Sequence, residues 1–440
     1  MKALPTILLA AVLAGLVGVD LSGQRQPTPE SKPTTAEPAA AKAAEKPTRS
    51  LAITGGDVYL GTGQIIRRAT VLVADDKITA VGHDLEIPEG ATVIDATGKV
   101  VSPGFVAVMA SGLGAPSTLS DGDVVDSINP YEPRMKMGLA AGITSYLANL
   151  KQGTSKPDGR SAVLKLAFGD LDGMVVRENS VLSMKVPLTP PQWKALRDLV
   201  EKAKKRETDG NEKADKEASK GKGKTAAAAK DLEPLLRVMK GDAVLWVSCS
   251  EIYDNRMISQ ALEIAALLGV GVVLDNPVTA WTMAEEIAET GSMAVIDPRH
   301  RQRADPERPR STGSNLASCA ILSRAGVPVA VRPPGGRFGG PSLGTGGILG
   351  QDLHTLNLDA AFAVRGGMDD HKALRTITLD AAKLIGAESR IGSIEVGKDA
   401  DLLILEGDPL NYRTFVSTAV VNGKVVYQKD KEPFYSHIRR

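Results

Sequence analysis

The middle of the chain alternates short apolar runs with segments of helical periodicity, and this alternation restricts the fold more than any other feature. The runs are typical of buried strands and lie at Phe105–Met109, Ile143–Leu147, Ala162–Leu166, Val244–Val247, Val270–Leu274, Met293–Ile296 and Val327–Val331. Apolar residues spaced as on one face of a helix occur within 258–268, 283–288 and 316–322. Residues 103–389 therefore predict an α/β fold, either a (β/α)8 TIM barrel or an open doubly wound sheet.

Two smaller β-rich segments flank this region. Residues 50–102 contain strand-like runs that are separated by turn signals such as Gly55-Gly56-Asp57. Residues 390–435 contain a run at Ala400–Leu405 and two further runs that are joined by Asn422-Gly423. Asn-Gly between β-rich runs is a strong hairpin signal, because both residues tolerate positive φ. We therefore expect a small β unit at each end of the folded sequence.

The N-terminal segment predicts export. Lys2 gives a positively charged start, and Ile7–Val19 is an apolar run of a length typical of a secretory signal rather than a membrane span. A cleavage site in residues 1–23 is weakly marked, so an uncleaved anchor is the alternative. Residues 24–49 contain five prolines and predict a disordered linker. We expect a periplasmic or cell-envelope protein that meets a membrane only through this N-terminal segment.

The charge pattern does not indicate a nucleic-acid partner. The chain has a net charge of +1, with 53 basic and 52 acidic residues. Residues 201–230 form a charged, low-complexity insertion with ten Lys or Arg and six Asp or Glu residues. This mixture of signs without an apolar stripe is typical of a solvated, partly helical insertion.

The cysteine content excludes a disulfide framework and a cysteine-rich metal site. Only Cys249 and Cys319 occur in the chain. One bridge between them is compatible with an oxidising compartment, but two buried free thiols are the expectation that we favour.

Several sequence blocks carry a family resemblance. They are Val93–Phe105 (VIDATGKVVSPGF), Gly138–Thr144 (GLAAGIT), Thr376–Gly386 (TITLDAAKLIG), Arg390–Leu402 (RIGSIEVGKDADL), Gly407–Leu410 (GDPL) and Val421–Val426 (VNGKVV). In order and spacing they resemble the metal-dependent amidohydrolase superfamily, and most closely its imidazolonepropionase-like branch. Together the blocks extend over most of residues 51–430.

The resemblance implies a fold and an activity. It implies a (β/α)8 TIM barrel at 103–389 and a small composite β-sandwich domain that is formed from both chain ends, 50–102 and 390–435. It also implies hydrolysis of C–N bonds in amides or cyclic amides. In that reaction a divalent metal lowers the pKa of a bound water to about 7, so that hydroxide is available at neutral pH.

The residues that the resemblance would assign to the metal are replaced here. In the family a His-x-His pair follows Pro-Gly-Phe, and these two positions are Met109 and Ser111 in this chain. A thioether and a hydroxyl are poor ligands for a divalent zinc-type ion. The family's last strand delivers an aspartate, whereas this chain reaches Pro334. The family's common site uses four histidines, and the barrel region holds only His300, His354 and His371. We therefore expect no metal cofactor.

Polar residues at other strand ends supply the remaining candidates for catalysis: Glu251, Asp275, Asp297 and His300. Active sites of this fold lie at the C-terminal ends of the strands, where carboxylates and an imidazole can act as acid and base or hold a relocated zinc ion. The same residue types are also common in strand-end turns, so ordinary structural roles are the favoured interpretation.

Four further polar residues lie at or near strand ends. Ser248 or Cys249 would need a nearby base to act as nucleophile, and His300 is the only plausible one. Arg332 follows the last apolar run. Lys165 corresponds to a strand lysine that is carboxylated in some relatives, but without histidines to share metal ions we expect an ordinary buried or surface lysine.

We thus expect an exported protein of the amidohydrolase fold without standard metal-dependent catalysis, with a small-molecule ligand at the barrel mouth as its partner. The alternative is an active C–N hydrolase that has a relocated metal or acid–base site. Assembly into a homo-oligomer is a further expectation from the resemblance.

Overall fold

The structure is a computed structural model that describes residues 48–115, 123–148, 150, 154–208, 224–249, 255–333 and 356–432. By its contacts the chain divides into Met1–Lys46, which lies outside the described residues, and Pro47–Arg440, which forms one compact unit. The predicted signal and nearly all of the predicted linker therefore lie outside the description. Among the described residues, no helix is long and apolar enough to cross a membrane.

One sheet of eight strands joins the two ends of this unit. Its strands are β1 (Ser50–Tyr59), β2 (Ile65–Ala74), β3 (Lys77–Gly82), β4 (Thr92–Asp95), β5 (Val100–Pro103), β15 (Leu402–Leu405), β16 (Val416–Val421) and β17 (Lys424–Gln428). The order is β17-β16-β15-β5-β1-β2-β3, with β4 paired to β1. The strands of the N-terminal and C-terminal segments meet where β15 pairs antiparallel with β5. The two predicted β-rich segments thus share one sheet, whereas their separation from the rest of the unit as a sandwich domain stays a prediction.

The predicted hairpin at Asn422-Gly423 is confirmed. The two residues connect β16 to β17 with φ angles of 50° and 66°. These values are those of a two-residue turn with positive φ at both positions, which matches the twist of antiparallel strands.

A second sheet has five parallel strands. They are β10 (Val181–Lys185), β11 (Val244–Ser248), β12 (Val273–Asp275), β13 (Met293–Ile296) and β14 (Val329–Val331), paired in this order. The sequence pattern predicted the last four of them. It missed β10, because a strand of mixed polarity (VLSMK) has no continuous apolar run.

A third sheet corrects the expectation of uniform parallel units. It contains β6 (Phe105–Ala107), β7 (Ile143–Ala148), β8 (Ala162–Lys165) and β9 (Val175–Glu178). β6 and β7 are parallel, but β8 runs antiparallel to both β7 and β9. A parallel crossover needs a dozen or more residues, usually with a helix. Between β8 and β9 the chain offers only the short helix α2 (Leu171–Met174), so the strand reverses.

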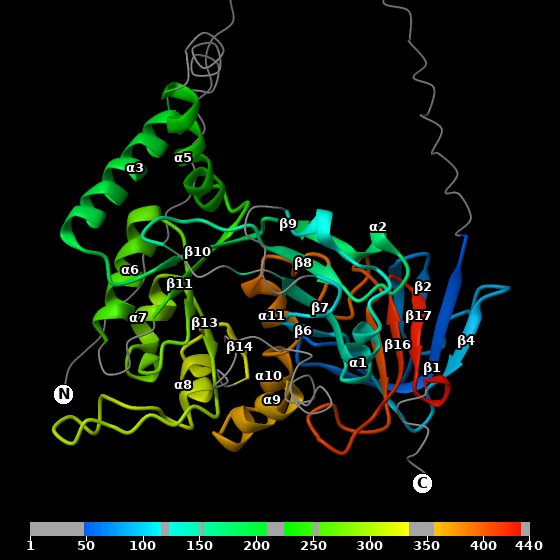
Figure 1. Ribbon diagram of the computed structural model, residues 1–440. Coiled ribbons are helices and arrows are strands. Elements are labelled where there is room, and N and C mark those ends of the chain that lie inside the picture. The colour runs from blue at the N-terminus through cyan, green and yellow to red at the C-terminus, as the bar shows by residue number, and fades with distance from the viewer. Residues whose placement is uncertain are drawn as a thin grey trace, which may run out of the picture. The chain divides into compact units, whose positions relative to one another are not determined.

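Helices cover the strands. They are α1 (Arg134–Ala140), α3 (Pro190–Thr208), α5 (Lys224–Met239), α6 (Arg256–Leu268), α7 (Ala284–Glu289), α8 (Ser318–Arg324), α9 (Leu356–Arg365), α10 (Asp370–Arg375) and α11 (Leu379–Leu384), with short 3-10 turns at Val125–Ser127, Ala280–Thr282 and Lys429–Lys431. α6, α7 and α8 lie on one side of the five-stranded sheet, and α11 lies on the other (Figure 1). The charged insertion at 201–230 continues α3 and begins α5, and its middle lies outside the described residues.

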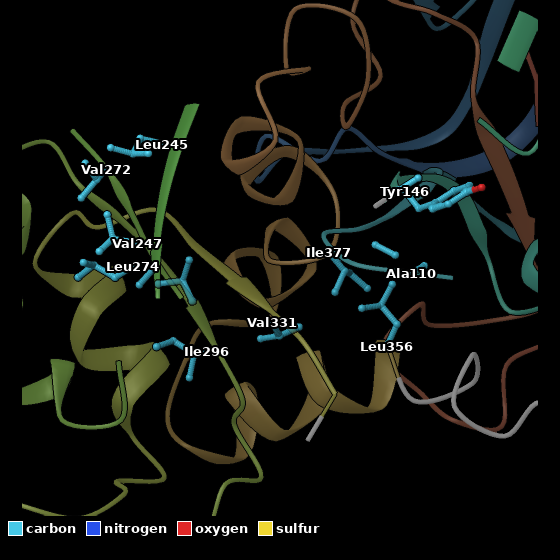
Figure 2. Packing of buried hydrophobic residues seen from close by; sticks show 14 of the residues in the cluster. Ala110, Tyr146, Leu245, Val247, Val272, Leu274, Ile296, Val331, Leu356 and Ile377 are labelled. Atoms are coloured by element: carbon cyan, nitrogen blue, oxygen red, sulfur yellow. The ribbon is translucent and has the colours of Figure 1, made fainter. Parts of the chain in front are cut away.

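Alternate residues of the strands enter two different buried clusters. Leu245, Val247, Leu274 and Ile296 belong to the large cluster that includes the helices α6 and α8 (Figure 2). A second cluster holds the intervening residues, with Val106, Leu147, Val163, Val181, Trp246, Val273, Val295 and Ala330 from eight strands, together with residues of α11. Because successive side chains of a strand point to opposite faces, the two clusters lie on opposite faces of the strands. The second cluster and its face of the strands are called the inner cluster and the inner face below.

The two cysteines are free and buried, which confirms the favoured expectation. Burial raises the pKa of both thiols, and that of Cys319 reaches about 12.

Candidate functional site

The inner face of the five-stranded sheet ends in charged side chains. Val273, Val295 and Ala330 lie in the inner cluster on β12, β13 and β14. Two residues further along the same strands come Asp275, Asp297 and Arg332. Since side chains two residues apart share a face, these three groups extend the inner face at the C-terminal ends of three adjacent strands.

Asp275 and Arg332 form a buried ion pair. The Arg332 Nη1 donates to Asp275 Oδ1 at 2.9 Å, and the two side chains are 16% and 7% exposed for Asp275 and Arg332, respectively. Burial raises the pKa of Asp275, and the positive charge of Arg332 opposes that shift. The pair joins the ends of β12 and β14 across β13. In the described part of the chain, the Arg332 Nε has no hydrogen-bond partner.

Asp297 lies beside His300 in the turn after β13. Its Oδ1 accepts a hydrogen bond of 2.9 Å from the Arg299 backbone N–H, and its Oδ2 lies 3.8 Å from the His300 Nδ1. Burial raises the pKa of Asp297, whereas the Arg299 N–H and the charges of His300 and Arg332 lower it. The turn therefore holds a carboxylate near the Nδ1 edge of the imidazole.

A second ion pair connects this turn to α9. The Arg299 Nε donates to Asp359 Oδ1 at 2.6 Å, and the Asp359 side chain is fully buried. Burial raises the pKa of Asp359 to about 7, although Arg299 opposes the shift. The Arg299 guanidinium also lies 6.0 Å from the centroid of the Phe362 ring.

A small pocket opens beside Asp297. Its lining includes Asn276, Asp297, His300, Asn315 and Ser318. The space for the centre of a water-sized sphere is about 10 Å³. The His300 Nε2 and the Ser318 Oγ are both buried and have no hydrogen-bond partner among the described residues.

Comparisons with known proteins agree with the sequence blocks. A profile of the "Amidohydrolase family" matches residues 281–427. A solved amidohydrolase from Thermotoga maritima MSB8 covers 86% of this chain and is covered over its whole length, with 24% identity and a TM-score of 0.65. A prolidase solved with N-methylphosphonate-L-proline covers the same share at 16% identity and a TM-score of 0.50.

The chain is therefore similar to amidohydrolases, in sequence over residues 281–427 and in fold over most of its length.

Local matches to curated relatives are short. The dihydroorotase of Mycobacterium tuberculosis is 59% identical over 39 residues, and that of Caldicellulosiruptor saccharolyticus is 51% identical over 41 residues. These matches span only 9% and 10% of the two relatives. They show sequence similarity over one short block, and no activity of this chain follows from them.

The structure brings three of the four predicted catalytic candidates together. Asp275, Asp297 and His300 follow two adjacent strands, and Asp275 and Asp297 both interact with Arg332. Glu251 lies outside the described residues, as does Pro334. Met109 packs, partly buried, against the inner cluster.

The donor residues that the structure describes do not fit a divalent metal. Among the described residues, no group of three or more His, Cys, Asp or Glu side chains is arranged to hold an ion. The Asp275 carboxylate already faces the guanidinium of Arg332, and Asp359 faces that of Arg299. A divalent ion would have to displace these fixed positive charges in a site that is shielded from solvent.

The other groups considered from sequence lie elsewhere or are inert. Cys249 is buried, and burial and the charge of Asp275 raise its pKa, so a nucleophilic thiolate is disfavoured. Lys165 is fully buried and binds Asp399 and Asp401 of the C-terminal segment, with Nζ–Oδ2 distances of 2.6 and 2.9 Å. Its amino group is therefore committed to an ion-pair network away from the strand ends that carry Asp275.

Sequence reasoning missed Ser318 and Asp359. Ser318 begins α8, and serine is a common residue at the start of a helix. Asp359 is 60 positions away from its partner Arg299 in the sequence. No local pattern links either residue to the turn at Asp297. Only the packing of α8 and α9 against the strands brings them there.

Proposed function

We propose that this protein is an amidohydrolase-fold protein that does not use the superfamily's metal-activated water and instead binds a small molecule at the ends of its strands. The observation that carries the proposal is the ion pair between Arg332 and Asp275. It places a fixed positive charge among the carboxylates that a relocated metal site would need. Met109 at the first strand supports the same conclusion, because a thioether is a poor ligand for a zinc-type ion.

We also propose that the two barrel-side sheets close into one (β/α)8-type barrel. On one side, the segment at Thr376 and Ile377 accepts hydrogen bonds from Val331 of β14 and Val106 of β6, at 3.3 and 2.7 Å. On the other side, Asp158 exchanges backbone hydrogen bonds with Ser183 of β10 at 3.0 and 2.8 Å. The inner cluster, with members from eight strands, supports a filled interior of the kind found in such barrels.

The ion pairs also favour ligand binding over catalysis by carboxylates alone. Asp275 and Asp359 each contact a guanidinium, so neither is poised as a free general acid or base. A polar ligand that reaches the strand ends would meet both positively charged guanidinium groups and negatively charged carboxylates. Such convergence of a few polar groups on a largely apolar interior is typical of small-molecule sites.

A metal-free C–N hydrolase is the second candidate. The observation that favours it is the Asp297–His300 contact of 3.8 Å, because an imidazole that is oriented by a carboxylate is a common general base. This candidate shares the absence of a metal with the first.

Metal analysis tests the proposal. The purified full chain is incubated with zinc, manganese or iron(II), desalted, and analysed by inductively coupled plasma mass spectrometry. We expect no stoichiometric metal in the wild type. As a matched control, Arg332→Met removes the guanidinium at nearly constant size and reports whether that charge is what excludes the ion. One firmly bound metal per wild-type chain that is lost in Asp275→Asn would overturn the proposal.

A further inference from the structure

The pocket beside Asp297 has the features of a water site next to a base. We propose that His300 is a metal-free general base and that it acts on a single water molecule held between its Nε2 and the Ser318 Oγ. The inference goes beyond the proposed function but rests on its premise that no metal activates the water. The ligand class is an acyl compound with an activated leaving group, because a neutral imidazole activates water only for such substrates without a metal's help.

The size and polarity of the pocket fit one water. Its space of about 10 Å³ for water centres is close to the minimum that a single buried water requires. The two atoms that face it without partners among the described residues are the His300 Nε2 and the Ser318 Oγ. Buried polar atoms without partners are rare in folded proteins, so a shared water is the simplest ligand for both.

Asp297 orients the imidazole for this role. Its Oδ2 lies 3.8 Å from the His300 Nδ1, so the carboxylate favours the tautomer with the proton on Nδ1. Nε2 then carries the free lone pair that faces the pocket. Catalytic hydrogen bonds are often longer in the free protein and shorten when the substrate binds. Asp297 is held in place by the Arg299 backbone N–H at 2.9 Å.

The charges around His300 come from several elements. Asp297 and Arg299 lie on its own turn, and Arg332 follows β14. The charge of Asp297 in turn raises the pKa of Cys319 on α8 and of Asp359 on α9. The nearest negative charge is that of Asp297, which stabilises the imidazolium that forms when His300 takes a proton.

The step balances without a further reactant. The water oxygen attacks the acyl carbon and forms a C–O bond, while one water proton moves to the His300 Nε2. The tetrahedral intermediate then expels the leaving group, which takes that proton from the imidazolium as the C–X bond breaks. The products are the carboxylic acid and the protonated leaving group, and His300 returns to its neutral form.

The hydrolysis of p-nitrophenyl acetate by the full-length protein tests His300. We expect a rate above the buffer background that rises with the deprotonation of one imidazole, is slower in D₂O, and falls by about tenfold or more in His300→Gln. His371→Gln, which removes the histidine of α10, is the matched control and should retain the wild-type rate. Circular dichroism and thermal unfolding confirm that each variant is folded. A wild-type rate equal to background, or an unchanged rate in His300→Gln, would overturn the inference.

Ser318 is tested as a positioning residue. Ser318→Ala should lower kcat with little change in KM and should shift the midpoint of the pH profile, whereas Ser318→Thr, which keeps the hydroxyl, should restore both. A Ser318→Ala variant with the wild-type rate and pH profile would contradict the shared water. These failures differ from failure of the proposed function, which would appear as bound metal and as loss of hydrolysis on treatment with a chelator.

Discussion

Asp359 is a single buried carboxyl whose titration should be visible in the stability of the whole protein. Its folded-state pKa is raised to about 7 from a reference of 3.8, mainly by burial. A raised pKa means that the folded state binds the proton more tightly than the unfolded chain does. The stability that this proton provides is full below the reference pKa and is lost as the pH rises through the folded-state value.

We therefore expect Asp359→Asn to flatten the pH dependence of unfolding. Between roughly pH 5.5 and pH 8.5 the wild type should lose on the order of 2 kcal/mol from this group, and the variant should not. Asn retains an oxygen that can accept from the Arg299 Nε. Urea denaturation at the two pH values measures the difference, with Asp370→Asn on the exposed start of α10 as the control. Parallel pH curves for wild type and Asp359→Asn would contradict the shifted pKa.

The positions of single site residues were predictable only for residues that directly follow a predicted strand. Asp275 and Asp297 follow apolar runs whose alternation fixes the side on which they point, so the sequence placed them at the strand ends. The sequence did not reveal that Arg332 neutralises Asp275, because that pairing depends on the order of the strands. Ser318 and Asp359 were missed for the same reason, since their partners lie far away along the chain.

At the scale of elements, the junction between β5 and β6 explains one glycine of the Pro-Gly-Phe block. A Cβ on Gly104 would lie 1.9 Å from the Thr144 Oγ1 and 2.6 Å from the Thr144 Cβ. Thr144 lies on β7, is buried, and is held by the strand that pairs with β6. The glycine is therefore required by close packing of neighbouring strands.

We expect Gly104→Ala to destabilise the protein by about 1–3 kcal/mol, which is the usual cost of overpacking a core position. Gly82→Ala at the end of β3 is the matched control, because a Cβ there would meet only the Leu85 Cδ2 at 4.0 Å. Guanidinium denaturation of both variants provides the comparison. Equal midpoints for the two variants would show that β7 can shift to make room.

Elements were predicted well where they were long or strongly apolar. β11, β13 and the helix α6 follow directly from apolar periodicity. The reversed direction of β8 could not be predicted, because a buried apolar run has the same pattern in a parallel and in an antiparallel strand. The connection to β9, which holds only the short helix α2, is too short for a parallel crossover.

At the scale of the whole molecule, a buried ion network ties β8 to the sheet that joins the two chain ends. Lys165 contacts Asp399, Asp401 and the Asn422 Oδ1, the last at 2.6 Å. Asp399 also pairs with Lys77 near the start of β3 and with Arg390. Burial alone would raise the pKa of Asp399, but these cations outweigh it and lower that pKa. The network therefore links three distant parts of the sequence through one carboxylate.

This network leads to a prediction about cooperativity. Lys165→Met leaves buried carboxylates with one cation fewer, and removal of one partner of a buried ion pair costs about 3–5 kcal/mol. Because Pro47–Arg440 forms one compact unit, we expect the most protected amides of β16 and of β12 to lose the same free energy of opening. Hydrogen exchange with mass spectrometry under native conditions measures both sets of peptides.

Lys424→Met provides the matched control, because Lys424 also joins the C-terminal strands to the α2 region through Asp170 at 2.6 Å. The two side chains are 44% and 29% exposed, and exposed pairs contribute less than about 1 kcal/mol. The same chemical change should therefore have little effect at this surface position. If Lys165→Met weakened protection in β16 and left β12 unchanged, the eight-stranded sheet would unfold on its own. The two chain ends would then form a separate domain, as the sequence predicted, and the buried lysine would hold two independently folded parts together.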